Sequence, residues 1–294
     1  MGIGLERMSS QQKVRIDLTK FNMATIKNTS VIQFLGRRGS GKSYLLRNLC
    51  YFHRSIPCGT IISPTESSNE FFGKFVPSIF IFDEFQPEII DRFVKRQIMI
   101  TKKYNKEIKE NGRSNINPHA ICILDDCLAS SSLWLQDKNI RFLFLNGRHA
   151  HILFCLTSQY PLGMPPLYRT NIDYTFILRE PIKSNRKRIY EAYAGMVPSL
   201  DMFETILDSC TENFECLVVN NCTVSNKLED QLFWYKAAEN HAFRLGAQQF
   251  WDLSALAEAE GEEEEEYNVE REMQQMLGAK KRNGMSISIR KKDS

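Results

Sequence analysis

The chain has 294 residues, of which 43% are hydrophobic, and its formal net charge is +3. Residues 258–294 hold ten acids and seven bases, so the rest carries 31 basic and 25 acidic residues, a mildly basic body that permits nucleic-acid binding. No apolar run approaches the roughly 20 residues of a membrane span, and residues 1–20 lack the apolar core of a secretory signal, so we expect a soluble protein with neither.

The first predicted elements surround a glycine-rich segment. Residues 14–19 alternate apolar and polar side chains and predict an edge strand, and the apolar run 31–35 predicts a buried one. Gly36 to Ser43 then match the pattern G-x-x-x-x-G-K-[ST], and helix formers follow at 44–50. Because the N–H groups of such a loop and the helix N-terminus point at phosphate oxygens, the sequence predicts a phosphate-binding loop, or P-loop.

The P-loop carries the predicted nucleotide site. We expect Lys42 to reach the β- and γ-phosphates of ATP, and the Ser43 hydroxyl to bind Mg²⁺. The predicted nucleotide-binding residues are Gly36, Arg37, Arg38, Gly39, Ser40, Gly41, Lys42, Ser43 and Tyr44.

Strand and helix patterns alternate along the rest of the chain. Strands are predicted at 59–63, 78–82, 120–124, 151–156, 171–178, 214–219 and 231–235, and helices at 87–109, 139–145, 184–194 and 199–210. This alternation indicates βαβ units and an α/β fold with a central, mainly parallel sheet flanked by helices. Ligands gather at the carboxyl ends of such strands, which is where the P-loop, Asp125, Asp126 and Gln159 fall.

Two predicted strands end in paired acids, Asp83–Glu84 and Asp125–Asp126. A P-loop enzyme needs one carboxylate for the Mg²⁺ shell and a base or water-orienting group beside it. We favour Asp125 for the metal and Asp126 for the attacking water, because a strand beside theirs could place the Gln159 amide between the γ-phosphate and that water. The pair at 83–84 stays open as the alternative.

The C-terminal segment changes composition beyond about residue 256. Blocks of like charge at 262–266, 280–282 and 290–292 cannot bury a core, so we predict disorder with one short helix near 267–277. The expected organisation is an N-terminal extension with an edge strand (1–27), a P-loop ATPase domain (28–240) and a charged, disordered tail (241–294). Eight scattered cysteines without a C-x-x-C pair indicate reduced core residues and a cytosolic compartment.

The order of motifs over residues 28–236 resembles the genome-packaging ATPases of nucleocytoplasmic large DNA viruses, which are FtsK/HerA-type P-loop motors. The motifs are the P-loop, Ser63–Glu66, Leu124–Asp126, Asn146–His149, Thr157–Tyr160 and Arg169–Asp173. The resemblance implies a RecA/ASCE-like fold, ATP and Mg²⁺ as cofactors, and ATP-driven translocation of double-stranded DNA by a homo-oligomeric ring that fills the capsid. Capsid or inner-membrane portal components are the implied partners, and the host cytoplasm (viral factory) or the virion is the implied location.

The resemblance also assigns roles at the predicted site. Asp125 matches the metal-binding acid, Asp126 the water-activating acid and Gln159 the sensor glutamine. The family's usual residue at the second position is glutamate, so Asp126, with its shorter reach, is a departure from the family's pattern.

A ring motor further needs a cation from the neighbouring subunit against the charge that grows on the γ-phosphoryl group. Arg148, just before the predicted sensor strand, is the first candidate and Arg169 the second, and an ordinary surface arginine is the alternative for either. For sequence-independent DNA contacts, the candidates are the bases of the predicted helix 87–109 and the loop after it, unless they only form a solvated face. These are Arg92, Lys95, Arg96, Lys102, Lys103, Lys106, Lys109 and Arg113.

Two other functions stay open. One is a small-molecule or nucleoside kinase, in which Arg186, Lys187 and Arg188 would form an arginine lid, although an acid pair followed by a glutamine-ended strand suits water activation better. The other is a non-catalytic nucleotide-binding protein of virion assembly. A GTPase is disfavoured, because the sequence has no Asn-Lys-x-Asp motif.

Overall fold

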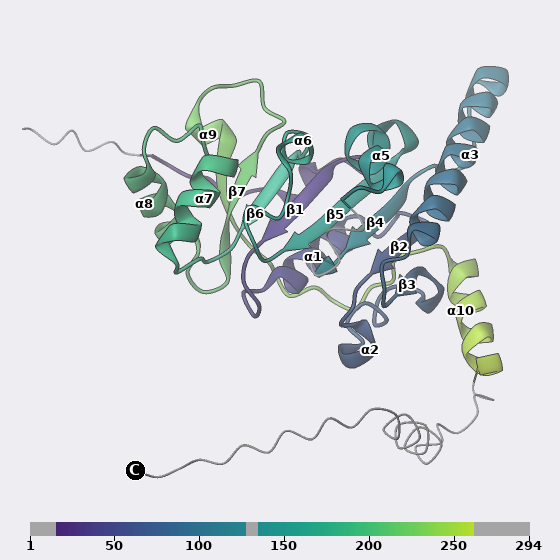
Figure 1. Cartoon of the computed structure of the whole chain (residues 1–294). Coiled ribbons are helices and arrows are strands. Elements are labelled where there is room, and N and C mark those ends of the chain that lie inside the picture. The colour runs from purple at the N-terminus through teal and green to yellow at the C-terminus, as the bar shows by residue number, and fades with distance from the viewer. Residues whose placement is uncertain (1–15, 128–134, 262–294) are drawn as a thin grey trace, which may run out of the picture. The chain divides into compact units, whose positions relative to one another are not determined.

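The computed structural model describes residues 16–127 and 135–261. Their strands form one sheet of eight strands in the order β3-β2-β4-β5-β1-β6-β7-β8 (Figure 1). The strands are β1 Val31–Leu35, β2 Gly59–Ile62, β3 Ile81–Phe82, β4 Ala120–Leu124, β5 Ile152–Ser158, β6 Tyr174–Ile177, β7 Glu215–Asn220 and β8 Leu232–Lys236.

The first six strands in this order, from β3 at the edge to β6, pair in parallel. Strands β7 and β8 extend the sheet in antiparallel orientation. Every residue of β1, β2, β4, β5 and β6 is buried. Continuous apolar runs are typical of parallel strands that are covered on both faces, which is why these segments do not alternate. The predicted α/β fold with a mainly parallel sheet is confirmed.

Helices cover the sheet, with α1 on β1, α3 on β2, α5 on β5 and α8 on β7. Their bounds are α1 Lys42–Phe52, α2 Glu66–Asn69, α3 Pro87–Asn111, α5 Lys138–Asn146, α6 Pro166–Arg169, α7 Lys183–Tyr193, α8 Leu200–Cys210, α9 Leu228–Gln231 and α10 Gln248–Gly261, with 3-10 turns η1 Met23–Thr25, η2 Ser78–Phe80 and η4 Gly147–Ala150. Among the described helices, none combines the length and apolarity needed to cross a membrane.

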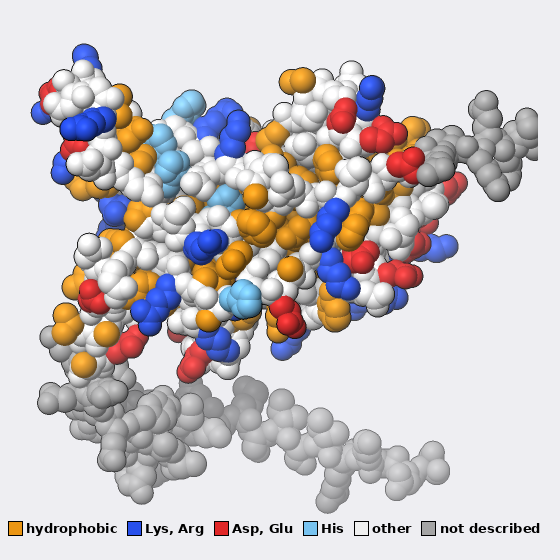
Figure 2. Space-filling view, turned by 180° about the vertical axis from the view of Figure 1, so that it is seen from behind, with side chains coloured by type: hydrophobic (Ala, Val, Ile, Leu, Met, Phe, Trp, Pro, Cys, Tyr) orange, Lys and Arg blue, Asp and Glu red, His pale blue; other side chains and the backbone are white. Residues whose placement is uncertain are grey.

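Helix α3 is the longest of these helices and projects past the sheet at the upper right of Figure 1. Pro87 occupies its first turn and Gly112, with φ +70°, ends it, as expected for these two residue types. Its first half buries an apolar stripe that includes Ile90 and Phe93, whereas residues 102–111 are mostly exposed. Figure 2 shows Lys and Arg side chains around the projecting end, at the upper left of that view.

Three predicted segments differ from the structure. In the predicted edge strand, 14–15 lie outside the described residues and 16–19 form no strand, because Asn22 caps η1 and turns the chain after a single bridge from Lys20 to Trp234. Only the last two residues of the predicted strand 78–82 join the sheet, since the segment after Pro77 makes the turn η2 that buries Phe80.

The third difference concerns the segment from residue 241 onward, which we predicted to be a disordered tail. The structure describes helix α10 within it. The Phe250 ring lies 4.8 Å from that of Phe80, and the Trp251 indole donates to the Leu245 carbonyl oxygen, so aromatic contacts that charge composition does not reveal hold the start of this helix. The short helix predicted near 267–277 lies outside the described residues.

Candidate nucleotide site at the carboxyl ends of the parallel strands

The P-loop connects the end of β1 to the start of α1, and its glycines have separate structural roles. Gly39 (φ +74°) and Gly41 (φ +103°) adopt left-handed conformations that favour glycine. A Cβ atom on Gly36 would lie 2.8 Å from the Cβ of Leu178, so only glycine fits there. Because no side chain caps the N-terminus of α1, its N–H groups remain available to an anion.

Lys42 is buried inside this loop. Its ammonium group donates to the carbonyl oxygens of Gly36 at 2.8 Å and Arg37 at 3.0 Å. Burial lowers the pKa of Lys42, while the charges of Asp126 and then Asp125 raise it in part. The lysine is therefore held close to both acids and at the centre of the loop, where a phosphate oxygen would compete for its hydrogen bonds.

Asp125 is 7% exposed and is held by two hydroxyl groups. Thr157 Oγ1 donates to its Oδ1 at 2.8 Å, and Ser63 Oγ donates to its Oδ2 at 3.3 Å. Burial raises the pKa of Asp125, and these hydrogen bonds and the Lys42 charge offset part of that shift. The carboxylate is thereby fixed between the ends of β2 and β5.

Asp126 adopts a left-handed backbone conformation with φ +53°. Its N–H donates to the Thr157 hydroxyl at 2.8 Å, and the Gln159 amide donates to both of its carboxylate oxygens at 2.6 Å. A non-glycine residue in this conformation needs its surroundings to hold it, and these two contacts do so. The structure thus brings the predicted water-activating acid and the predicted sensor amide into direct contact.

Sheet topology explains the convergence. Strand β5 lies between β1 and β4, with Leu35 opposite Ser158, so the P-loop, residues 157–159 and the acid pair leave three neighbouring carboxyl ends. The alternative pair, Asp83–Glu84, is exposed and follows β3 at the sheet edge, with three strands between it and β1. The geometry favours the pair at 125–126.

The residues at this point fit Mg²⁺. Asp125 and Ser43 offer carboxylate and hydroxyl oxygens, the donors that this cation prefers. Within residues 16–127 and 135–261, no group of three or more His, Cys, Asp or Glu side chains could hold a metal by itself. Mg²⁺ in general takes few protein ligands and completes its shell with substrate phosphates and water.

The two predicted trans arginines lie elsewhere. Arg148 is exposed in η4, ahead of β5, and the following His151 accepts a hydrogen bond from the N–H of Ala120 at the start of β4. Arg148 therefore lies at the amino ends of the strands, whereas the P-loop of its own chain lies at their carboxyl ends. Arg169 donates to the Met164 carbonyl oxygen at 2.8 Å and lies 5.9 Å from the centre of the Tyr193 ring.

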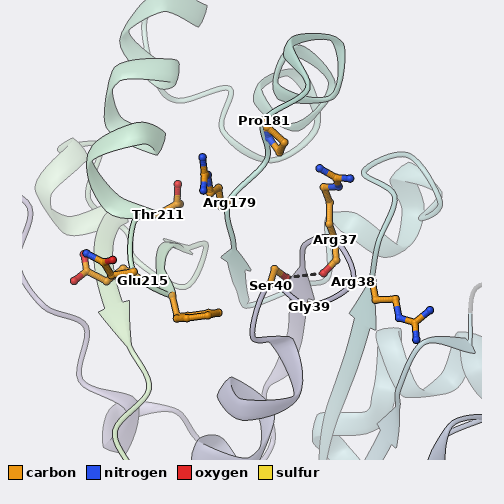
Figure 3. Close-up of a pocket in the computed structure, with 10 residues that line it drawn as sticks. Arg37, Arg38, Gly39, Ser40, Arg179, Pro181, Thr211 and Glu215 are labelled. Atoms are coloured by element: carbon orange, nitrogen blue, oxygen red, sulfur yellow. Dashed lines mark hydrogen bonds between the residues drawn. The ribbon is translucent and has the colours of Figure 1, made fainter.

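Beside the P-loop lies a feature that the sequence reasoning missed, a hollow of about 600 Å³ that we call the basic hollow. Arg37 and Arg38 border it from the loop, and Arg179 borders it from the segment after β6 (Figure 3). The sequence offered one signal for Arg179, which directly follows the predicted strand 171–178. In the structure this segment contains β6, which pairs with β1. Among the residues that the structure describes, Glu215 is the one acid that lines it, so the three arginines leave an excess of positive charge that suits an anion.

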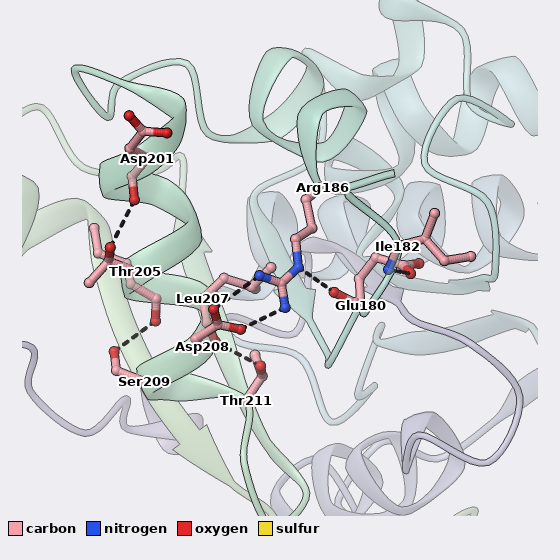
Figure 4. Close-up of polar contacts among 10 residues, drawn as sticks. Glu180, Ile182, Arg186, Asp201, Thr205, Leu207, Asp208, Ser209 and Thr211 are labelled. Atoms are coloured by element: carbon pink, nitrogen blue, oxygen red, sulfur yellow. Dashed lines mark hydrogen bonds and ion pairs between the residues drawn. The ribbon is translucent and has the colours of Figure 1, made fainter. Parts of the chain in front are cut away.

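Arg186, one of the arginines of the kinase hypothesis, is fully engaged (Figure 4). Its guanidinium donates to both carboxylate oxygens of Asp208, at 3.0 and 2.6 Å, and to the Glu180 carbonyl oxygen at 2.6 Å. This bidentate pair joins α7 to α8. Since a lid arginine must be available to a substrate, Arg186 does not suit that role in this structure.

Comparison with known proteins places the chain in a family. No family model matches it. Protein L437 of Acanthamoeba polyphaga mimivirus is 38% identical over 239 residues, which cover 81% of this chain and 83% of L437. Protein 088R of Invertebrate iridescent virus 3 is 37% identical over 209 residues, covering 71% and 76%. The chain belongs to the L437 family of large DNA viruses.

These sequence identities confirm the resemblance to proteins of large DNA viruses that the motif order predicts. Among solved structures, the genome packaging NTPase B204 of Sulfolobus turreted icosahedral virus 2, in complex with AMPPCP, superposes with a TM-score of 0.50. It is 15% identical, and the match covers 73% of this chain and all of B204. At this identity the match shows the fold, which confirms a P-loop NTPase architecture for this member of the L437 family.

Proposed function

We propose that this protein is an ATPase that moves double-stranded DNA into a viral capsid as part of a homo-oligomeric ring. The observation that carries the proposal is the meeting of Lys42, Asp125 and Asp126 at one end of the sheet, with one hydroxyl, that of Thr157, bonded to both acids. Two findings support the packaging role. The chain belongs to a protein family of large DNA viruses, and it shares its fold with a genome packaging NTPase.

Each residue of the site has a proposed part in ATP hydrolysis. Lys42 binds the β- and γ-phosphates, while Ser43 and Asp125 hold Mg²⁺, which neutralises phosphate charge when bound. Asp126 accepts the proton of the attacking water, and Gln159, hydrogen-bonded to it, orients that water. This division suits hydrolysis because the buried Asp125 is fixed by hydroxyl donors, whereas the oxygens of the half-buried Asp126 accept hydrogen bonds from the Gln159 amide alone among the described residues.

The projecting end of α3 is the proposed DNA contact. Lys95 pairs with Asp91, Lys106 pairs weakly with Glu110, and Arg96 donates to Gln97, so these bases are partly occupied. By contrast, Lys102, Lys103 and Lys109 are exposed and form no ion pair with the described residues. Exposed lysines on a projecting helix suit contacts with phosphates that ignore base sequence.

A triplex-displacement assay tests the proposed function. A duplex carrying a fluorescent third strand is incubated with the protein and Mg²⁺-ATP, and release of that strand reports movement along DNA. We expect release by the wild-type chain, none by Lys42→Ala, and unchanged release by Lys183→Ala, which removes an exposed lysine on α7. Failure of the wild-type chain to displace the strand would contradict the proposal.

A further inference from the structure

A second recess adjoins the P-loop on its α1 side. This recess, which we call the aromatic cleft, has a volume of about 740 Å³ and runs from Gly41, Lys42 and Ser43 past Tyr44 to residues 236–240 after β8. Tyr44, Phe71 and Phe214 supply its aromatic walls. The Tyr44 and Phe214 rings are 68% and 70% exposed, although such side chains usually gain stability from burial.

Phe214 is unusual in its backbone as well as in its exposure. It has φ +63° and follows Asn213 with φ +51°, so two consecutive non-glycine residues are left-handed in the turn from α8 to β7. The Glu215 N–H, donating to the Glu212 carbonyl oxygen at 2.9 Å, closes this turn. Strained backbone of this kind concentrates at ligand-binding sites, where other contacts compensate for it.

The strained turn brings the Phe214 ring to the P-loop. A Cβ atom built on Gly41 would lie 3.5 Å from Phe214 Cδ1, so the ring stands against the last residue before α1. Phe214 also borders the basic hollow and therefore separates the two recesses. If a triphosphate occupies the P-loop, its base can lie in either recess. The basic hollow, lined by Arg37, Arg38 and Arg179, suits anions, so the aromatic cleft suits the uncharged base better.

The segment 236–240 also lines the cleft and is fixed to α1. Two of its residues, Ala237 and Ala238, have small side chains. The Ala238 carbonyl oxygen accepts a hydrogen bond from the side chain of the buried Asn48 at 3.4 Å, and the Tyr235 hydroxyl donates to Asn48 Oδ1. These bonds attach the segment after β8 to α1, so the cleft is formed before any ligand arrives.

We infer that the aromatic cleft binds the base of a purine nucleoside triphosphate, and that Phe214 stacks on that base. The inference rests on the proposed function and deepens it by naming the residue that recognises the nucleoside. Stacking needs a planar face rather than hydrogen-bond readout, which an exposed ring at the mouth of the P-loop supplies. A purine offers the larger face.

The test measures the affinity of two ligands, ATP and inorganic tripolyphosphate, by isothermal titration calorimetry. Each ligand is titrated into the wild-type chain and into Phe214→Ala. Tripolyphosphate fills the P-loop but has no base. We expect Phe214→Ala to weaken ATP binding by about ten- to a hundredfold while tripolyphosphate affinity is unchanged. Phe214→Trp should restore ATP affinity, and Phe52→Ala, which removes a half-exposed ring elsewhere on α1, should change neither.

Unchanged ATP affinity in Phe214→Ala would overturn the inference and leave the proposed ATPase intact. Equal loss of ATP and tripolyphosphate binding would overturn it too, because that result means damage to the P-loop. If the wild-type chain bound neither ligand, the proposed function itself would fail, and the inference with it.

Discussion

A single hydroxyl group organises the acids of the site. Thr157 Oγ1 accepts from the Asp126 N–H and donates to Asp125 Oδ1, both at 2.8 Å. One oxygen therefore holds the left-handed backbone of Asp126 and orients the carboxylate of Asp125. Loss of a residue that orients a metal-binding carboxylate typically lowers metal affinity or activity by about ten- to a hundredfold.

Removing that hydroxyl should impair hydrolysis without changing side-chain shape. We predict that Thr157→Val lowers Mg²⁺-dependent ATP turnover by about ten- to a hundredfold and raises the Mg²⁺ concentration needed for half-maximal rate. Thr175→Val is the matched control, because the Thr175 hydroxyl is buried in β6 and makes no hydrogen bond among the described residues. Identical Mg²⁺ titrations for the two variants would contradict this role.

At the same scale, motif spacing predicted the residues that we propose bind phosphate and metal, but not the residues that hold them in place. Lys42 and Asp125 follow from local patterns, because a P-loop and a strand ending in acids are contiguous in sequence. Ser63 and Thr157 reach Asp125 from two other strands, and their bonds exist only once the sheet has formed. Phe214 could not be predicted either, since its left-handed conformation has no signature in the residue type.

Among the elements, α3 is the longest described helix, and its residues 102–111 are mostly exposed. The salt dependence of DNA binding counts the phosphates that a protein contacts, with a slope of about 0.9 per contact. We predict that Lys102→Glu combined with Lys103→Glu weakens duplex binding and reduces that slope by about 2. The control is Lys95→Glu, at a base already paired with Asp91. A salt slope equal to that of the wild-type chain would remove α3 from the DNA surface.

The end of α1 carries a buried histidine that should make stability depend on pH. His53 is 4% exposed, its Nδ1 lies against Asn28 Oδ1, and its Nε2 has no hydrogen-bond partner among the described residues. Burial lowers the pKa of His53 from 6.5 to about 4. Between these values the unfolded chain binds the proton and the folded chain does not, so the stabilisation is complete above pH 6.5 and is lost as the pH falls toward 4.

The expected size of this effect is set by the width of that window. Between pH 6.5 and 5.5, the free energy of unfolding of the wild-type chain should fall by about 1 kcal/mol more than that of His53→Gln. Urea denaturation at several pH values measures the difference, and the remaining histidines cancel because both proteins share them. Parallel stability curves would show that His53 is not held neutral by the fold.

Element prediction succeeded where the signal was continuous and failed where tertiary contacts decide. The runs 31–35 and 120–124 coincide with β1 and β4, because fully buried parallel strands are apolar throughout. Residues 16–19 alternate like a strand, yet the cap of η1 at Asn22 ends the pairing after one bridge. Short elements such as α2 depend on side-chain bonds to the residues that follow them, here those of the Glu66 carboxylate with the N–H groups of residues 71–73.

For the whole molecule, the position of Arg148 makes its proposed role depend on assembly. It lies at the amino ends of the strands, so it cannot serve the nucleotide of its own chain, and only a neighbouring subunit in a ring could use it. We predict that Arg148→Ala binds ATP normally and hydrolyses it roughly a thousandfold more slowly. Mixing these subunits with Lys42→Ala subunits should restore part of the turnover, because the latter keep an intact Arg148.

The mixing experiment has its own control. A double variant, Lys42→Ala with Arg148→Ala, supplies neither group and should restore nothing. If both mixtures behaved alike, Arg148 would be an ordinary surface residue, and Arg169 would be the next arginine to examine in the same way.

The proposed function requires that nucleotide hydrolysis at this site be coupled to duplex DNA. The most direct measurement is steady-state phosphate release from Mg²⁺-ATP by the wild-type chain, with and without saturating linear double-stranded DNA. We expect a rate that rises several-fold on adding DNA of any sequence and disappears in Lys42→Ala. A rate that duplex DNA leaves unchanged would contradict it.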